Sequence, residues 1–163
     1  MNLRTDTVLL PSGKTSLREV VEHRQAVCIL AENERNEILF VRQHRYPVGA
    51  AILEVPAGVV EPGEDPLKTA HRELREEVGM DAREMGEIAR FYTSPGFCDE
   101  EIFLFFASGL FPSPLEGDED ETILVETWNR ETILKALEKG EIRDGKTLVA
   151  LYWYLARKDL FFS

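Results

Sequence analysis

Residues 58–80 read GVVEPGEDPLKTAHRELREEVGM and predict one helix that carries many carboxylates. Pro66 suits the first position of a helix, and Asp65 can cap the N-terminus in front of it. Gly79 is well placed to end the helix, because glycine readily adopts the left-handed conformation that follows many helices. The segment therefore predicts a helix over residues 66–78.

This helix has an apolar side and an acidic side. Its apolar residues recur at helical spacing and form a stripe that can pack on a sheet: Leu67, Ala70, Leu74 and Val78. Glu73 and Glu77 lie four residues apart and point to one side, and Glu76 lies within a turn of them. Like charges at this spacing destabilise an isolated helix by about a few tenths of a kcal/mol, so the cluster indicates a bound cation.

Ligands that are all oxygen favour Mg²⁺ or Mn²⁺ over zinc.

The alternative to a metal site is a solvated acidic helix face, in which Arg72 and Glu76 form an ordinary ion pair. The fixed positions of a longer pattern, G-x5-E-x7-R-E-U-x-E-E-x-G-U with U apolar, argue against that alternative. All of them are filled, by Gly58, Glu64, Arg72, Glu73, Leu74, Glu76, Glu77, Gly79 and Met80.

This pattern is the Nudix box, and the chain resembles the Nudix hydrolase family. Segments outside the box are similar to its ADP-ribose pyrophosphatase branch, namely VRQHR at 41–45, LEVPAG at 53–58, SPGFCDE at 94–100 and the acidic DEDE at 118–121. Within these segments Cys98 stands where relatives commonly carry a hydroxyl residue. The resemblance implies hydrolysis of the pyrophosphate of ADP-ribose to AMP and ribose 5-phosphate. Alternatives are another nucleotide sugar such as GDP-mannose, a dinucleotide, or a sensor that binds such ligands without cleaving them.

The resemblance also implies a role for the residues of the box. Glu73 and Glu77, with the backbone carbonyl of Ala57, would bind the metal. Glu76 would be an additional or outer ligand, and Arg72 would orient a glutamate rather than touch substrate. The bound cation would neutralise the phosphates and lower the pKa of a water molecule.

Residues outside the box would complete the catalytic group and bind the substrate. In the late acidic loop, Glu121 is expected as a further metal ligand and Glu119 as the general base. The alternative for this loop is an acidic surface turn without a function. The residues expected to bind substrate are Arg18, acting from a partner subunit, Arg45, Glu54 and Glu100.

The remaining segments predict an α/β (α+β) fold, with a mixed sheet sandwiched between helices. Residues 1–24 predict a β-hairpin around the turn Pro11-Ser12-Gly13-Lys14, and residues 25–163 form the Nudix domain. Strands are expected at 26–31, 37–42, 51–55, 87–92, 102–107 and 123–128, and later helices at 130–139 and 146–158. In the resembling branch the hairpin is exchanged between subunits, which implies a homodimer.

The composition narrows the function classes. Thirty acidic residues against nineteen Lys and Arg give a net charge of −11, which disfavours nucleic acid and acidic membrane surfaces as partners. The sequence has two cysteines, no signal-peptide pattern at its start, and no apolar run long enough for a membrane span. These features favour a cytoplasmic protein that acts on a small nucleotide.

Overall fold

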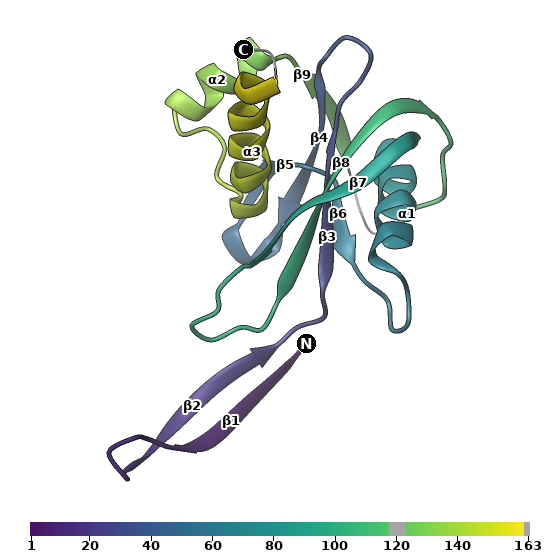
Figure 1. Ribbon diagram of the computed structural model, residues 1–163. Coiled ribbons are helices and arrows are strands. Elements are labelled where there is room, and N and C mark those ends of the chain that lie inside the picture. The colour runs from purple at the N-terminus through teal and green to yellow at the C-terminus, as the bar shows by residue number, and fades with distance from the viewer. Residues whose placement is uncertain (118–122, 162–163) are drawn as a thin grey trace.

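The computed structural model describes residues 1–117 and 123–161 and contains strands in two sheets, a hairpin and three α-helices. Figure 1 shows their arrangement. The strands are β1 Asn2–Leu9, β2 Thr15–Glu22, β3 Ala26–Ala31, β4 Ile38–Arg45, β5 Ala50–Glu54, β6 Ala57–Val59, β7 Met80–Tyr92, β8 Glu101–Pro112 and β9 Leu124–Trp128. The helices are α1 Pro66–Val78, α2 Arg130–Glu138 and α3 Gly145–Phe161, with a short 3₁₀ turn at Tyr46–Val48.

The predicted mixed sheet is confirmed, and a second sheet lies beside it. The mixed sheet has the order β6-β3-β8-β7, in which β3 and β8 run parallel and the other pairs are antiparallel. The second sheet has the order β5-β4-β9 and is antiparallel. Helix α1 lies on one side of the strands, and α2 and α3 lie on the other (Figure 1).

Strand β3 forms the centre of the core, and all six of its residues are buried. Because side chains alternate along a strand, Cys28 and Leu30 pack toward α2 and α3, while Val27 and Ile29 pack toward α1. A strand covered on both faces has no polar side. This explains the continuous apolar run that the sequence shows at 26–31.

Helix α1 begins and ends where the sequence predicts. The Asp65 side chain accepts a hydrogen bond of 2.9 Å from the Leu67 N–H, and Gly79 follows with a φ of 73°. The predicted stripe is slightly rotated. Ala70 and Leu74 are buried against the sheet, but Leu67 is 39% exposed and Thr69 takes its place in the interior. Beside this buried stripe, Glu73 and Glu77 approach β6, at Gly58 and Ala57 respectively.

Strands β4 and β8 and helix α3 extend beyond their expected bounds, and two further differences arise from pairing between distant strands. The Pro56-Ala57-Gly58 segment ends β5 as expected, but it continues into the short strand β6, which pairs with β3. Strand β7 begins at Met80 rather than near Glu87, because its first half pairs with the far end of β8. Both pairings join segments distant in sequence, and the charged residues at the start of β7 hide any apolar alternation.

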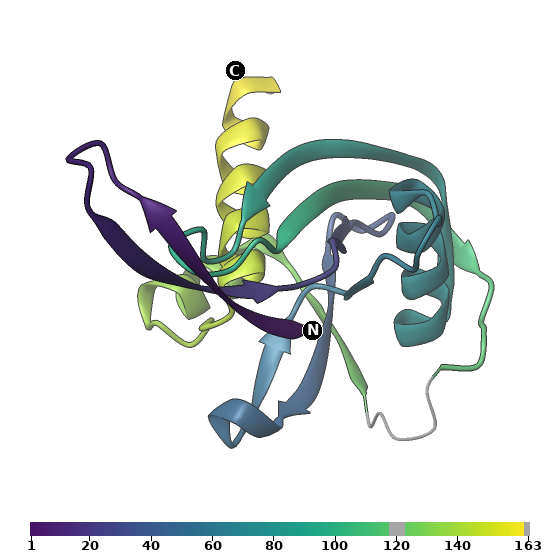
Figure 2. The same cartoon turned by 90° about the horizontal axis from the view of Figure 1, so that it is seen from below.

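Strands β1 and β2 form the predicted hairpin, which extends away from the rest of the protein (Figures 1 and 2). The hairpin is attached near its base, where the Val21 N–H donates a hydrogen bond of 2.7 Å to the Phe97 carbonyl. Within the described residues, no helix is long and apolar enough to cross a membrane.

Candidate active site

A cleft of about 1160 Å³ lies between α1, the ends of the central strands and the start of α3. The residues at its acidic side come from β6 and α1 and include Ala57, Gly58, Arg72, Glu73, Glu76 and Glu77. The other lining residues include His23, Arg24, Arg45, Tyr92, Glu100, Asp144 and Lys146. Five fixed residues of the predicted box therefore meet in one concave site, together with residues far away in the sequence.

Gly58 provides the space into which the carboxylate of Glu73 fits. A Cβ atom built on Gly58 would lie 1.9 Å from both Cδ and Oε1 of Glu73, far inside any allowed contact. The Glu73 side chain is only 12% exposed in this position. A glycine is required here by the close approach of the carboxylate.

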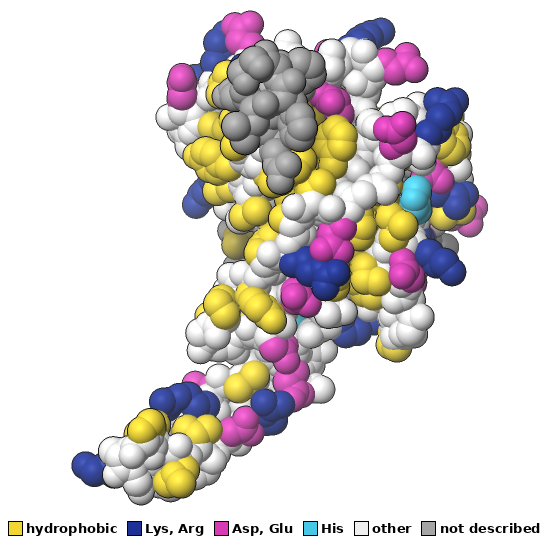
Figure 3. Space-filling model, in the orientation of Figure 1, with side chains coloured by type: hydrophobic (Ala, Val, Ile, Leu, Met, Phe, Trp, Pro, Cys, Tyr) yellow, Lys and Arg dark blue, Asp and Glu magenta, His cyan; other side chains and the backbone are white. Residues whose placement is uncertain are grey.

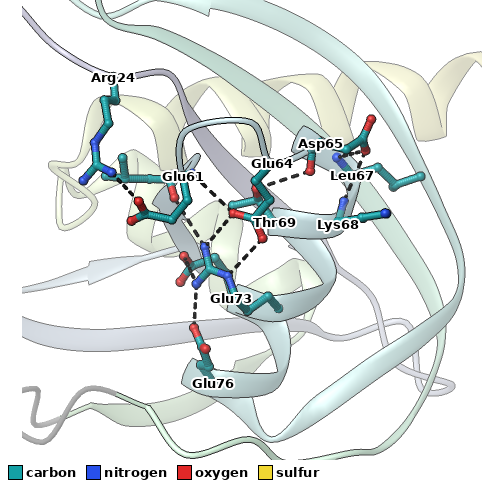
Figure 4. Close-up of polar contacts among 11 residues, drawn as sticks. Arg24, Glu61, Glu64, Asp65, Leu67, Lys68, Thr69, Glu73 and Glu76 are labelled. Atoms are coloured by element: carbon teal, nitrogen blue, oxygen red, sulfur yellow. Dashed lines mark hydrogen bonds and ion pairs between the residues drawn. The ribbon is translucent and has the colours of Figure 1, made fainter.

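Arg72 contacts three glutamates, Glu64, Glu73 and Glu76, which lie close together in Figure 4. Its Nη1 lies 2.7 Å from Oε1 of Glu73 and 2.8 Å from Oε2 of Glu76, and its Nε lies 3.2 Å from Oε1 of Glu64. Burial acts to lower the pKa of Arg72, but the hydrogen bond to Glu64 and the charges of Glu73 and Glu76 outweigh it and raise this pKa. Arg72 is therefore a permanent cation that orients carboxylates, which is the arrangement that the sequence suggests.

Glu77 is held by the backbone of the neighbouring strand. Its Oε2 accepts a hydrogen bond of 2.9 Å from the Ala57 N–H in β6. The same residue, Ala57, is the one whose carbonyl the sequence suggests as a metal ligand. Glu77 and Ala57 thus lie close together although 20 residues separate them.

The donor atoms at this side of the cleft suit a hard divalent cation. They are the carboxylate oxygens of Glu73, Glu76 and Glu77, which line the same cleft, with no thiol or imidazole among the box residues. Within residues 1–117 and 123–161, no three His, Cys, Asp or Glu side chains are placed so that together they could hold a metal ion. In this structure the guanidinium of Arg72 contacts Glu73 and Glu76. Glu119 and Glu121, the expected base and further ligand, lie outside the described residues.

Arg45 and Glu54, both expected to bind substrate, lie next to each other and form an ion pair. Nε and Nη2 of Arg45 each donate a hydrogen bond of 2.7 Å to the carboxylate of Glu54. Lys146 also contacts this carboxylate, and Glu54 is 1% exposed. Arg45 and Lys146 line the cleft, whereas Glu54 lies behind them. The burial of Glu54 does not fit the expected direct contact with substrate, because both of its oxygens are already occupied.

Burial by itself would raise the pKa of Glu54, but the hydrogen bond from Arg45 and the charge of Lys146 outweigh it and lower this pKa. A carboxyl whose pKa is lower in the folded state stabilises the protein at neutral pH, and this contribution is lost as the pH falls through the lowered pKa. Folding stability should therefore decrease in acid partly through this residue.

Glu54→Gln is expected to lower the free energy of unfolding by about 3 kcal/mol at neutral pH, because it leaves Arg45 without its anion and the buried Lys146 with only one of its two. The deficit should shrink in acid, where the wild-type carboxyl is protonated. Urea denaturation at several pH values measures both effects. Glu131→Gln is the matched control, since Glu131 pairs with Lys135 in an exposed ion pair, which contributes little to stability. Equal losses in the two variants would contradict the structural role of Glu54.

The two remaining candidates lie in different places. Glu100 lines the cleft, where it accepts a hydrogen bond of 2.9 Å from the Thr93 hydroxyl and lies 3.1 Å from Nδ1 of His23. Arg18 lies on β2, and its Nη1 donates to the Ser16 hydroxyl and the Leu17 carbonyl, both at 2.8 Å. It borders a smaller hollow beside residues 95–99 and does not line the cleft of its own chain.

Several residues of the cleft were not anticipated from the sequence. Lys146, Asp144, His23 and Arg24 line it, yet none belongs to a recognisable spacing pattern. Asp144 does carry a local signal, because an aspartate in front of an apolar helical segment is a typical N-cap. It caps α3 by accepting a hydrogen bond of 2.9 Å from the Thr147 N–H.

The chain is similar to known proteins over nearly its whole length. The model of the NUDIX domain matches residues 22–151. An ADP-ribose pyrophosphatase from Bacillus subtilis strain 168 is 43% identical over 161 residues, which cover 98% of this chain and 86% of that protein. A methanol dehydrogenase activator from Bacillus methanolicus is 41% identical over 162 residues, which cover 98% and 88%. A crystal structure of an ADP compounds hydrolase superposes with a TM-score of 0.84 at 25% identity, covering 97% of this chain and 86% of the other.

Proposed function

The chain belongs to the NUDIX hydrolase family, and on this basis we propose that it hydrolyses the pyrophosphate of ADP-ribose to AMP and ribose 5-phosphate. The observation that carries the proposal is the fixed pair of box carboxylates, with Glu73 seated against Gly58 and Glu77 hydrogen-bonded to Ala57. The relative from Bacillus subtilis, which bears the name of this activity, supports ADP-ribose as the substrate. The cleft is large enough for a dinucleotide-sized ligand.

Nudix hydrolases generally need divalent cations, and we propose Mg²⁺ or Mn²⁺ for this chain. When bound, such a cation neutralises phosphate charge and lowers the pKa of a water molecule. Glu73, Glu77 and the Ala57 carbonyl would hold it, and Glu76 would add an outer ligand. Arg72 contacts Glu73 and Glu76, and its role would be to orient them rather than to bind substrate. These residues would position the cation, which neutralises the phosphate charge, and would form no covalent bond with the substrate. Positioning and electrostatics of this kind dominate phosphoryl transfer.

The late acidic loop would supply the proton acceptor. In this proposal Glu119 takes a proton from the attacking water, and Glu121 is a further metal ligand. Both residues lie outside the described residues. The resemblance of the segment at 118–121 to the ADP-ribose pyrophosphatase branch supports the assignment. Glu119→Gln and Glu121→Gln, compared with each other over a pH series, would separate the base from the ligand.

The substrate contacts follow from the lining of the cleft. Arg45 would donate to a phosphate or ribose oxygen, since Nη1 is not used by Glu54. Glu100 would accept from ribose hydroxyls. Glu54 would act through Arg45 rather than on the substrate. Arg18 would reach the cleft of a partner subunit.

The test is a substrate panel with Mg²⁺ or Mn²⁺. Purified protein is incubated with ADP-ribose, GDP-mannose, dinucleotides and nucleoside triphosphates, and the products are separated by chromatography. We expect AMP release to be fastest from ADP-ribose and to stop with EDTA. Binding of ADP-ribose without any hydrolysis would instead indicate a sensor, and faster hydrolysis of triphosphates would overturn the proposal.

A broader substrate range within ADP-linked compounds is the second candidate. The solved relative described as an ADP compounds hydrolase favours it, because that structure matches the chain over 97% of its length. Under this alternative the ADP group is recognised and the distal group varies. Similar kcat/KM values for ADP-ribose and ADP-linked dinucleotides would favour it over a dedicated ADP-ribose hydrolase.

We also propose a homodimer, because one face of the hairpin is apolar and exposed. Leu3, Leu9 and Leu17 lie on the same face by the pairing of β1 with β2, and all three are exposed. Figure 3 shows apolar side chains along this arm. A lone hairpin is marginal in water, so a second subunit that covers this face would stabilise it.

The two free cysteines agree with a reducing compartment, which supports the cytoplasm as location.

Sedimentation velocity at micromolar concentration is expected to give a dimer, with twice the chain mass of 18.6 kDa. Leu17→Glu should shift the protein toward monomer, because it places a charge in the apolar face. Lys139→Glu introduces a glutamate outside the hairpin, at the C-terminal end of α2, and should leave the dimer intact. A monomeric wild type would remove both the exchange of the hairpin and the role of Arg18 across subunits.

A further inference from the structure

A row of alternating charges forms the wall of the cleft at the ends of β4 and β5 and the start of α3. Arg45 donates two hydrogen bonds to Glu54, Lys146 contacts the same carboxylate, and Nζ of Lys146 lies 3.1 Å from Oδ1 of Asp144. Arg45, Asp144 and Lys146 line the cleft. The roles proposed above use Arg45 and leave Lys146 and Asp144 without one.

Lys146 is held more firmly than a surface lysine. Its side chain is 13% exposed, and carboxylates contact its ammonium group from two sides. Asp144 is itself fixed, because it accepts hydrogen bonds from the Thr147 N–H at 2.9 Å and the Thr147 hydroxyl at 2.6 Å. The Thr147 hydroxyl oxygen in turn accepts from the Val55 N–H at 2.9 Å. A ligand group that binds Lys146 therefore does not have to order it, and this preorganisation increases affinity.

The balance of charge in this wall favours a neutral ligand group. The two cations Arg45 and Lys146 are matched by the two anions Glu54 and Asp144, so the formal charge of the four is zero. A phosphate placed against Lys146 would also lie beside the carboxylate of Asp144 and would be repelled by it. A sugar hydroxyl is both donor and acceptor, so it can accept from Lys146 and donate to Asp144 at the same time.

We propose that Lys146 is a specificity-determining residue that, together with Asp144, binds a sugar hydroxyl of the substrate. This inference rests on the proposed hydrolysis of ADP-ribose and refines it. Glu54 is a positioning residue in this arrangement, since it is buried behind the wall and holds both Arg45 and Lys146. Sugar hydroxyls occur on the terminal ribose and on the adenosine ribose, and the experiment distinguishes the two.

The experiment compares wild type with Lys146→Met on three substrates. They are ADP-ribose, ADP esterified with n-pentanol, which lacks the distal hydroxyls, and ADP-ribose built on 2′,3′-dideoxyadenosine. A hydrogen bond to a charged group contributes enough that KM for ADP-ribose should rise roughly tenfold or more, with kcat changed less. The substrate that lacks the contacted hydroxyl should lose less than about twofold in kcat/KM. Lys135→Met, on the exposed surface of α2, is the matched control and should change nothing.

The outcomes separate this inference from the proposed function. Equal losses on all three substrates would mean that Lys146 binds phosphate, and no loss on any would mean that it binds no substrate; either result overturns the inference. The wild type and Lys146→Met can also be compared in binding alone, by calorimetric titration with ADP-ribose and with Ca²⁺ as the cation, so that no turnover occurs. A wild type that binds but never cleaves ADP-ribose refutes the proposed function while the binding data still decide the role of Lys146. A wild type that does neither overturns both.

Folding of the variant is measured in parallel by thermal melting, because Lys146→Met removes one partner of the buried Glu54. Lys146→Gln repeats the comparison with a side chain that can still donate a hydrogen bond to Glu54. A loss of substrate discrimination in both variants, with melting transitions close to wild type, supports the contact. If a folded variant still discriminates between the substrates as the wild type does, the proposed contact is overturned.

Discussion

Glu77→Gln is expected to reduce kcat for ADP-ribose by at least about a hundredfold while the protein stays folded. Changing residues that merely support a metal ligand already costs about 10- to 100-fold, so losing a ligand should cost no less. The amide keeps the shape of the side chain, and its oxygen can still accept the hydrogen bond from the Ala57 N–H. The substitution therefore removes charge from the site with little effect on packing.

The measurement is kcat over a Mg²⁺ titration, with urea denaturation as the check on folding. The variant should need more Mg²⁺ for half-maximal rate, which a purely structural defect would not produce. Glu84→Gln removes a glutamate from the exposed surface of β7 and should keep full activity. A Glu77→Gln protein that turns over at the wild-type rate would refute the assignment of Glu77 as a metal ligand.

Gly58→Ala should reduce activity by roughly a hundredfold and affect stability much less. The added Cβ would lie 1.9 Å from the Glu73 carboxylate, so that carboxylate has to move. The moving group is the end of a flexible side chain rather than backbone, which keeps the cost in folding free energy small. A shift of about 1 Å at a catalytic group can cost on the order of a hundredfold in rate.

Gly86→Ala is the control for this prediction, because nothing lies within 4 Å of a Cβ built on Gly86 and its φ is not positive. It should leave both activity and stability unchanged. Steady-state kinetics and urea denaturation of the two variants give the comparison. If Gly58→Ala kept wild-type activity, the position of Glu73 against Gly58 would not matter for the reaction.

The sequence by itself determined the parts of this protein whose causes are local. The bounds of α1 follow from Asp65, Pro66 and Gly79, which act within one turn of the helix, and the structure confirms both ends. The continuous apolar run at 26–31 likewise indicates a strand buried on both faces, and β3 is one. The full set of box residues sufficed to indicate the family and the kind of reaction.

Only the tertiary structure decided which distant residues meet. Glu54 has the same residue type as the box glutamates, and the sequence suggests a contact with substrate. In the structure it is buried, and its carboxylate contacts Lys146, which is 92 residues away. The pairing of β6 with β3 and the early start of β7 have the same origin. Caps and periodicity are encoded by neighbouring residues, whereas burial and charge pairing arise from packing between segments, so a single sequence shows the former and conceals the latter.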